Sequence, residues 1–400
     1  MLQNSRLLLA LVLVASGAAV GACSSDSTSG GAGSAQTDAG GGGGGGGFGT
    51  GGGEGGSSTL PCHPSSTNAE IAGNNCDDDG DGMVDNVPVC DSGLSATGDA
   101  AAFAHAMGIC DDASAKGFGL VSATFTRGYQ STDTPQDAQH SIMSKFGDVI
   151  KPHEGSMLGV ISSGYALEFD GPSGVGTFNS GKDWYGYGTG NTGKPGNGKA
   201  PPGFPKKSAG CAQNATVNDT VDVKLTLKVP PNAHGFKFDL DFWSGEWPAY
   251  VCSPFNDAFI AFLTSQGTTD NISFDPKGNP ISVNAGFLDR CSTTGTAVGA
   301  VGCAKGADAI PGMASCSAGA DELKGTGFFN QGMWCGTDTA TGGASTGWLT
   351  SSASVNPGET ITLELMVWDA GDGVLDSTTL LDNFRWTPDP VGTGTSVAVK

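Results

Sequence analysis

The chain has 400 residues, of which only 15% are charged, with 40 acidic and 19 basic side chains and a formal net charge of −21. This negative charge argues against a nucleic-acid partner and against binding to anionic lipid surfaces, but it is compatible with divalent cations. Short runs of Val, Thr, Phe and Trp alternate with Gly, Asn, Asp and Pro. Such a composition is typical of an all-β protein.

The N-terminus has the pattern of an export signal. An apolar stretch, LLLALVLVASGAAV, follows Arg6 and is too short for a transmembrane helix. It ends in Val-Gly-Ala-Cys, which resembles the lipobox of bacterial lipoproteins and implies that a lipid on Cys23 attaches the protein to a membrane. Ser24 and Ser25 follow, and by the same resemblance they favour the outer membrane, at its periplasmic face or on the cell surface. An ordinary signal peptide cut near Ala22 is the alternative.

The cysteines support export to an oxidising compartment. There are eleven, and ten remain if Cys23 is lipidated, so disulfides are the expected state. Zinc is disfavoured because the sequence has no Cys-x-x-Cys pair. The remaining cysteines form an early and a late group, each even in number and each able to close on itself: Cys62, Cys76, Cys90 and Cys110, then Cys211, Cys252, Cys291, Cys303, Cys316 and Cys335.

An acidic run lies between two of the early cysteines. CDDDGDGMVDNVPVC matches the first nine positions of an EF-hand loop, D-x-D-x-D-G-x-x-D, although Pro88 stands where that loop has its bidentate Glu. The run resembles thrombospondin type 3 repeats and MopE-type metal-binding repeats. The sequence therefore predicts a Ca²⁺ site, and a solvated acidic turn held by disulfides is the alternative. The candidate ligands are Asp77, Asp79, Asp81, Met83 and Asp85.

One short helix and about ten strands are expected. The helix candidate is 97–109, with Thr97 or Asp99 at its start and Gly108 at its end. The strands are short, their apolar residues alternate, and no strand–helix alternation is present, so we expect an all-β, jelly-roll-like β-sandwich. The turn PPNAHG between two of them is typical of a hairpin-like connection. The predicted strands are 118–127, 157–162, 165–170, 217–230, 236–243, 257–264, 272–274, 281–283 and 347–350, followed by a final pair.

The final pair of strands lies in 359–386. Apolar residues alternate along the first strand, from Ile361 to Val367, and the acidic connector DAGDGVLD follows. Carboxylates this close repel one another unless they are solvated or share a cation. A second, weaker Ca²⁺ site is therefore predicted, whereas Asp and Asn residues that bond to their own turns are the alternative. Its candidate ligands are Asp369, Asp372, Asp376 and Asp382, with Glu246 and Asp257 as further donors.

Several stretches together resemble a known family. They are FDLDFWSGEWPAYVCSPFNDAFIAFL, NISFDPKGNPISVNAGF and LMVWDAGDGVLDSTTLLDNFRW, supported by GTGF and GGASTGWLTSSASVNPGETI. The region 117–388 resembles the choice-of-anchor L domain, which implies a surface or secreted protein whose biochemical activity is unknown. The expected organisation is a signal peptide (1–22), a lipidated Cys with a flexible Gly/Ser linker (23–60), the Cys/Asp-rich module (61–95), a helix and connector (96–116), the β-sandwich (117–388) and a tail (389–400).

The sequence favours a binding protein over an enzyme. No G-x-S-x-G or H-E-x-x-H motif is present. Glu246 lies among Trp243, Trp247 and Tyr250, but no second carboxylate is marked as its partner, as a glycosidase would require. We therefore expect a calcium-stabilised, lipid-anchored binding or adhesion module whose ligand is a surface glycan or protein. The alternative is a secreted polysaccharide hydrolase with Glu246 as the acid.

Overall fold

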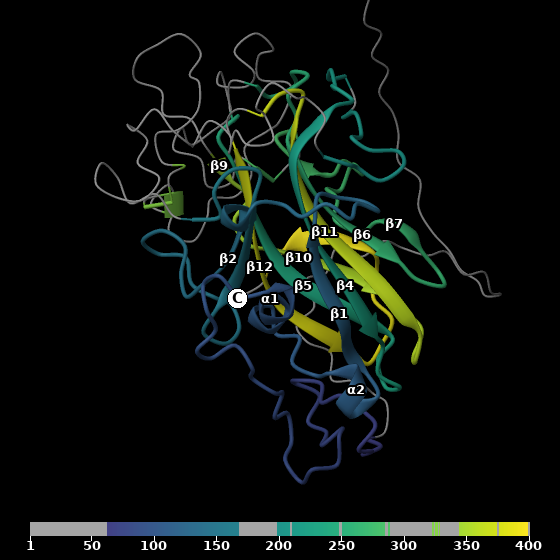
Figure 1. Cartoon of the computed structure of the whole chain (residues 1–400). Helices are drawn as coiled ribbons and strands as arrows, with labels where there is room; N and C mark the ends of the chain where they lie inside the picture. The colour runs from purple at the N-terminus through teal and green to yellow at the C-terminus, as the bar shows by residue number, and fades with distance from the viewer. Residues whose placement is uncertain are drawn as a thin grey trace, which may run out of the picture. The chain divides into compact units, whose positions relative to one another are not determined.

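The structure is a computed structural model. It describes residues 62–167, 198–208, 210–247, 250–284, 287–288, 322–323, 325–326, 328, 344–373 and 376–398. The predictions for the signal peptide, for Cys23 and for most of the linker lie outside these ranges, as do Cys291, Cys303, Cys316 and Cys335. The described part is a β-sandwich of two antiparallel sheets, which confirms the predicted all-β fold (Figure 1).

The first sheet has six strands in the order β1-β4-β11-β6-β7, with β8 paired to β6. Every pairing in it is antiparallel. Its long central strands are those with the strongest alternation in the sequence, because each turns every second side chain toward the core. The strands are β1 (Gly119–Thr126), β4 (Val217–Lys228), β6 (Ala258–Thr264), β7 (Thr269–Asn271), β8 (Ile281–Ser282) and β11 (Thr360–Ala370).

The second sheet has seven strands in the order β13-β10-β5-β12-β3-β2, with β9 paired to β5. These pairings are also antiparallel. The short helix η1 (Asp137–Gln139) leads directly into its edge strand β2. The strands are β2 (His140–Met143), β3 (Leu158–Ser162), β5 (Gly235–Ser244), β9 (Ala344–Ser345), β10 (Leu349–Ser354), β12 (Ser377–Thr387) and β13 (Gly394–Val397).

The main core fills the space between the sheets. The alternating apolar residues of β11 and β4 face those of β5 and are fully buried: Ile361, Leu363, Leu365 and Val367; Val221, Val223, Leu225 and Leu227; Phe236, Phe238, Leu240 and Phe242. Burial of this kind stabilises by about 25 cal/mol per Å² of apolar surface. The hairpin predicted at PPNAHG is wrong, because β4 and β5 belong to different sheets. Two strands with equally apolar faces bury both by facing each other across the sandwich, and the connection between β11 and β12 crosses in the same way.

The predicted helix forms as α1 (Ala100–Ala106), and the Asp99 side chain caps it by accepting a hydrogen bond from the Ala102 backbone N–H. Phe103 on its inner face contacts β3 so closely that a Cβ at Gly159 would lie 2.3 Å from the ring. The helix therefore covers one side of the sandwich. A second, four-residue helix, α2 (Ala113–Lys116), follows directly and was not predicted.

The Cys/Asp-rich module packs on the sandwich through specific hydrogen bonds. Asn232 of the β4–β5 connection accepts from the Ala69 backbone N–H at 3.0 Å and donates to the Ala69 carbonyl at 2.8 Å. Asp91 accepts from the backbone N–H groups of Ser156 and Met157. These bonds fix both ends of a segment that has few buried apolar side chains and that is coloured purple to blue in Figure 1.

Three disulfides are present among the described residues: Cys62–Cys76, Cys90–Cys110 and Cys211–Cys252. The early cysteines therefore pair within their own group, as predicted. The first two disulfides cross-link the module and join it to the end of α1, where a small segment cannot bury enough apolar surface to be stable alone.

Candidate metal centre

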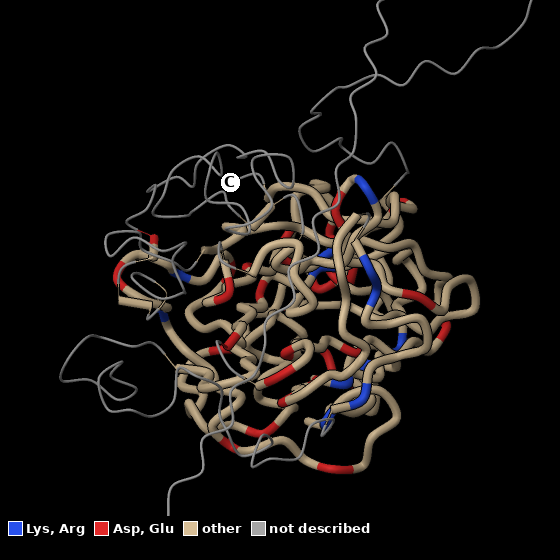
Figure 2. The backbone as a smooth tube through the Cα atoms, turned by 90° about the horizontal axis from the view of Figure 1, so that it is seen from above, with Lys and Arg blue, Asp and Glu red and all other residues tan. Residues whose placement is uncertain are grey.

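Six chain segments bring carboxylates or small polar groups to one end of the sandwich. β4, β6 and β12 begin there, whereas β3, β5 and β11 end there, because neighbouring strands in each sheet are antiparallel. Figure 2 shows acidic positions in the middle of the fold as well as on peripheral loops. We call the acidic set at this end the buried carboxylate cluster: Asp219, Glu246, Asp257, Asp369 and Asp376, which are 0, 2, 0, 1 and 5% exposed.

A β-bulge between β4 and β11 positions two members of this cluster. Val367 pairs with Val221, but Asp369 pairs with Asn218, so β4 carries one more residue than its partner. Asp219 lies in the bulge with a φ of 49°, a conformation that non-glycine residues rarely adopt. Bulges re-aim side chains next to functional sites, and strained backbone gathers at such sites. The bulge and the strained backbone therefore place Asp219 beside Asp369.

Asp257 is held firmly at the centre of the cluster. One carboxylate oxygen accepts from the Ala370 backbone N–H at 2.9 Å, and the other accepts from the Ser377 hydroxyl at 2.7 Å. These two donors come from the end of β11 and the start of β12. Asp257 thus links both sheets at the point where the chain crosses between them.

Asp369 has no such support. Neither of its carboxylate oxygens has a hydrogen-bond partner of normal geometry among the described residues, although both are buried. The nearby Ser163 hydroxyl donates instead to the Ser377 carbonyl at 3.2 Å. A buried carboxylate without donors costs several kcal/mol if it is ionised, so it is stable only with a proton or a cation.

Glu246 and Asp376 complete the cluster. A carboxylate oxygen of Glu246 lies 3.5 Å from the backbone nitrogen of Asp257. Asp376 packs against Gly164 so closely that a Cβ there would lie 1.8 Å from a carboxylate oxygen. Only glycine leaves room for the carboxylate at this position.

The pKa values follow from burial and mutual repulsion. Burial raises the pKa of Asp257 to about 7, with a further upward contribution from the charge of Asp372. Burial also raises the pKa of Asp369 well above its usual range, and the charges of Asp257, Asp376 and Asp219 raise it further. The pKa of Glu246 is raised well above normal by burial and then by Asp257 and Asp372. Burial and mutual repulsion therefore favour the protonated form of Asp257, Asp369 and Glu246.

The structure brings together only some of the ligands that the sequence predicts for the second Ca²⁺ site. Asp369, Asp376, Glu246 and Asp257 meet, and Asp372 is near enough to influence both Glu246 and Asp257. Asp382 does not join them. It lies five residues beyond Ser377 along β12, roughly 17 Å away at about 3.3 Å per residue. One of its oxygens accepts from the backbone N–H groups of His153, at 2.5 Å, and Glu154, at 3.2 Å.

The acidic loop of the module forms a different three-carboxylate group. Glu70, Asp77 and Asp79 each offer an oxygen within 4.8 Å of the others, the one group of this spacing that the described residues contain. The buried carboxylate cluster contains no three carboxylates of this spacing among the described residues. Asp81 and Asp85 bond to turn amides, since Asp81 accepts from the Met83 N–H and Asp85 accepts from the N–H groups of Asn74 and Asn75.

Two functional side chains, those of Glu70 and Asp219, and one glycine, Gly164, were not predicted. Glu70 lies seven residues before Asp77 and accepts from the backbone N–H groups of Asp78, Asp79 and Asp85, which no EF-hand spacing anticipates. Asp219 and Gly164 were also missed. The polar run Asn-Asp-Thr that interrupts the alternation at the start of β4 was the available signal for Asp219.

The comparisons with known proteins agree with this architecture. A family model described as the choice-of-anchor L domain matches residues 206–384, which confirms the resemblance seen in the sequence. The chain therefore carries a choice-of-anchor L domain, a class that indicates a surface-associated protein. The match spans β4 to most of β12, whereas β1, β2, β3 and β13 complete the same two sheets from outside it.

A search of curated proteins gave no match, and a search of solved structures gave none either. Within the described ranges, no helix has the length and apolarity needed to cross a membrane.

Proposed function

We propose that the protein is a lipid-anchored cell-surface binding or adhesion module whose β-sandwich is stabilised by Ca²⁺ at the buried carboxylate cluster. The observation that carries the proposal is Asp369, which is 1% exposed and has no hydrogen-bond partner of normal geometry on either oxygen among the described residues. The acidic groups around it make a cation the natural partner.

The donor set fits calcium better than the other common metals. Ca²⁺ takes six to eight oxygen ligands in flexible geometry, and the cluster supplies carboxylates from five different segments. Mg²⁺ demands a near-ideal octahedron and keeps several waters, for which a buried site leaves little room. Zinc prefers Cys and His ligands, and the cluster has only carboxylates. The first site at Glu70, Asp77 and Asp79 is proposed to bind Ca²⁺ as well.

The predicted lipid anchor on Cys23 and the choice-of-anchor L domain are both consistent with a protein that is displayed at the outer membrane. The lipid on Cys23 would hold the chain, and the Gly/Ser linker would place the sandwich away from the bilayer. The choice-of-anchor L domain supports a surface location. A protein displayed in this way works by contact, and its ligand is expected to be a surface glycan or protein.

The hydrolase alternative has less support. Its proposed acid, Glu246, is 2% exposed and lies beside Asp257 within the fold. A polysaccharide would reach this carboxyl only if the end of the sandwich opened. The raised pKa of Glu246, caused first by burial, is therefore explained by its surroundings without a catalytic role.

The test is the melting temperature of the full chain in EDTA and in excess Ca²⁺, for the wild type and for Asp369→Asn. Calcium should raise the melting temperature of the wild type. The variant should be more stable than the wild type in EDTA, since it removes a repelling charge, and its response to calcium should shrink to that of the first site. Asp133→Asn, a change in an exposed loop, is the matched control. An Asp369→Asn protein that responds to calcium like the wild type would refute the proposal.

A further inference from the structure

The Cys/Asp-rich module exposes a concentration of apolar side chains. Four of the seven exposed large hydrophobic side chains among the described residues lie within residues 83–89, and we call them the apolar loop patch: Met83, Val84, Val87 and Val89, which are 59, 56, 37 and 63% exposed. A segment of this length spans at most about 24 Å, so the four lie in one small area. The other three, Val121, Val149 and Val397, are far apart in the sequence. Single exposed apolar residues are ordinary, whereas a concentration of them marks a contact surface.

The apolar loop patch is joined directly to the three-carboxylate group of the module. Glu70, a member of that group, accepts from the backbone N–H of Asp85 at 2.7 Å, and Asp85 follows Val84 in the chain. Asp81 accepts from the Met83 backbone N–H at 2.8 Å. Negative charges therefore lie immediately beside the apolar side chains. Such charges keep the patch out of a lipid surface unless a cation neutralises them, because burying an unpaired charge is costly.

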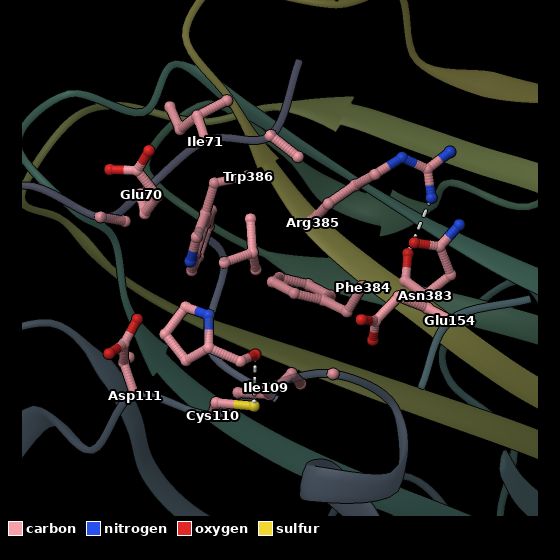
Figure 3. A pocket seen from close by; sticks show the side chains of 16 residues that line it. Glu70, Ile71, Ile109, Cys110, Asp111, Glu154, Asn383, Phe384, Arg385 and Trp386 are labelled. Atoms are coloured by element: carbon pink, nitrogen blue, oxygen red, sulfur yellow. Dashed lines mark hydrogen bonds between the residues drawn. The ribbon is translucent and has the colours of Figure 1, made fainter. Parts of the chain in front are cut away.

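Another side of the module is fixed to the sandwich. Ile71 is 6% exposed and lines the contact with β12 together with Glu70, and Figure 3 shows both beside Trp386. Asp91 of the module accepts from the backbone N–H of Met157 at 2.7 Å. The module thus buries one part of its surface against the sandwich and leaves the apolar loop patch in solvent.

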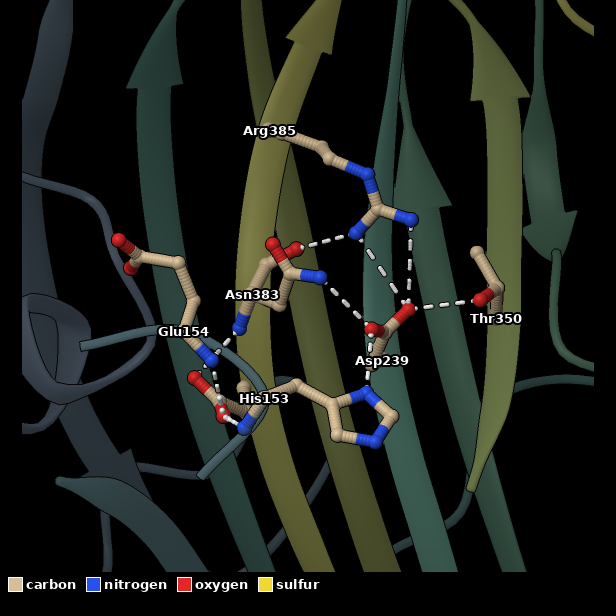
Figure 4. A network of polar contacts seen from close by, with 7 residues as sticks. His153, Glu154, Asp239, Thr350, Asn383 and Arg385 are labelled. Atoms are coloured by element: carbon tan, nitrogen blue, oxygen red, sulfur yellow. Dashed lines mark hydrogen bonds and ion pairs between the residues drawn. The ribbon is translucent and has the colours of Figure 1, made fainter. Parts of the chain in front are cut away.

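The strap that binds Asp91, residues 153–157, is in turn fixed to the second sheet. The His153 ring lies 3.0 Å from Asp239 of β5 (Figure 4). Asp239 also accepts from the Asn383 side chain of β12 at 2.8 Å. The chain of contacts from the module through the strap to β5 and β12 is therefore continuous. A surface that captures the apolar loop patch would orient the whole sandwich.

The predicted anchor argues that this surface is lipid. The chain between Cys23 and Cys62 is about 40 residues long, and Cys62 is bonded to Cys76 within the module. A Gly/Ser-rich chain of this length spans about 35 Å on average. A tether of that reach would hold the module near the bilayer at a roughly millimolar effective concentration, which a freely diffusing partner would not match.

From these observations we propose that the apolar loop patch inserts into the phospholipid surface that carries the anchor, and that Ca²⁺ held by Glu70, Asp77 and Asp79 joins the loop to lipid phosphates. The proposal rests on the lipid anchor and the first calcium site of the proposed function. The ion cancels the charge of the loop and attracts phosphate oxygens, which Ca²⁺ accepts as ligands. The apolar side chains then reach the acyl boundary, where they are removed from water.

The first test observes the loop in the lipidated protein, incorporated in nanodiscs of phosphatidylcholine and phosphatidylglycerol. Methionine methyl signals are recorded by NMR, with Met83 assigned through Met83→Leu, and a spin label on the lipid acyl chains broadens any methyl group that enters the bilayer. The Met83 signal should be broadened in Ca²⁺ and recover in EDTA, whereas Met157, half-buried in the strap, should be unaffected. A Met83 signal that stays sharp in Ca²⁺ would overturn the proposal.

The second test measures by co-sedimentation how tightly the lipid-free chain, residues 23–400 with Cys23→Ser, binds phosphatidylglycerol vesicles in Ca²⁺. Val84→Ser combined with Val89→Ser should weaken binding about tenfold. Val121→Ser, at a 53% exposed position on β1, is the matched control and should leave it unchanged, and melting temperatures check that every variant is folded. Serine variants that bind like the wild type would overturn the proposal. So would a change in self-association alone, which would assign the patch to a second copy of the chain.

Calorimetric titration with Ca²⁺ separates this proposal from the proposed metal centre. Calcium binding without vesicle binding refutes the lipid contact alone. If the module binds no calcium, the role of the ion is refuted, and the same serine variants are compared on phosphatidylcholine vesicles, which carry no net charge. Equal binding there refutes insertion as well. Co-sedimentation does not need the lipid on Cys23, so its outcome is independent of the predicted anchor.

Discussion

Asp257 should make the metal-free protein less stable as the pH rises. Its pKa is about 7 in the folded chain against 3.8 in the unfolded chain, so the folded state binds the proton more tightly. The stability that this group contributes is fully present below pH 4 and is lost as the pH rises through 7. A shift of about 3 units corresponds to roughly 4 kcal/mol, at 1.36 kcal/mol per unit.

The assay is urea denaturation in EDTA at several pH values between 4 and 8, for the wild type and for Asp257→Asn. The variant cannot titrate at this position, so the difference between the two profiles reports Asp257 together with its coupling to Glu246 and Asp369. The difference should change by roughly 4 kcal/mol across this range, and excess Ca²⁺ should abolish most of the change for the wild type by replacing the proton. Parallel profiles for the two proteins would refute the reasoning.

Three further predictions concern separate parts of the structure. Gly164→Ala should destabilise the folded chain by about 1–3 kcal/mol and reduce its calcium response, because the added methyl would lie 1.8 Å from Asp376; equal urea midpoints would contradict this. Asp79→Ala should remove the calcium response of the first site only, so that calorimetric titration still detects binding at the buried cluster. Asp239→Asn should destabilise by about 1–3 kcal/mol at pH 7, since its donors outweigh burial and lower its pKa. That loss should begin to fade as the pH falls below the unfolded value of 3.8 and should vanish as it falls through the lower folded pKa, and a loss that is as large at pH 2.5 as at pH 7 would contradict the explanation.

The sheet strands were predictable because their information is local. The alternation in β4, β5 and β11 identifies the buried face directly, and each predicted inward residue is buried. The arrangement of these strands into two sheets could not be predicted from the local pattern, because it depends on contacts between distant parts of the chain. The turn between β4 and β5 reads equally well as a hairpin or as a crossing between sheets, and only the need to bury two apolar faces against each other decides it.

Four of the five members of the buried carboxylate cluster were predicted from the sequence: Glu246, Asp257, Asp369 and Asp376. The connector after β11 marked Asp369 and Asp376, whereas Asp219 reaches them through a bulge that no spacing rule encodes. Asp382 was assigned to the same site because it is near in sequence. The rise of an extended strand carries it away to the backbone N–H groups of His153 and Glu154.

The central claim is that a cation takes the place of the protons in the buried carboxylate cluster. A crystal structure of the protein grown with calcium at pH 7.5, with anomalous scattering to identify the ion, tests it most directly. We predict a calcium ion bonded to Asp369 and Asp257, with Asp376 or Glu246 drawn in to complete the oxygen shell. Carboxyl groups bonded to one another through shared protons, with no ion between them, would contradict the account.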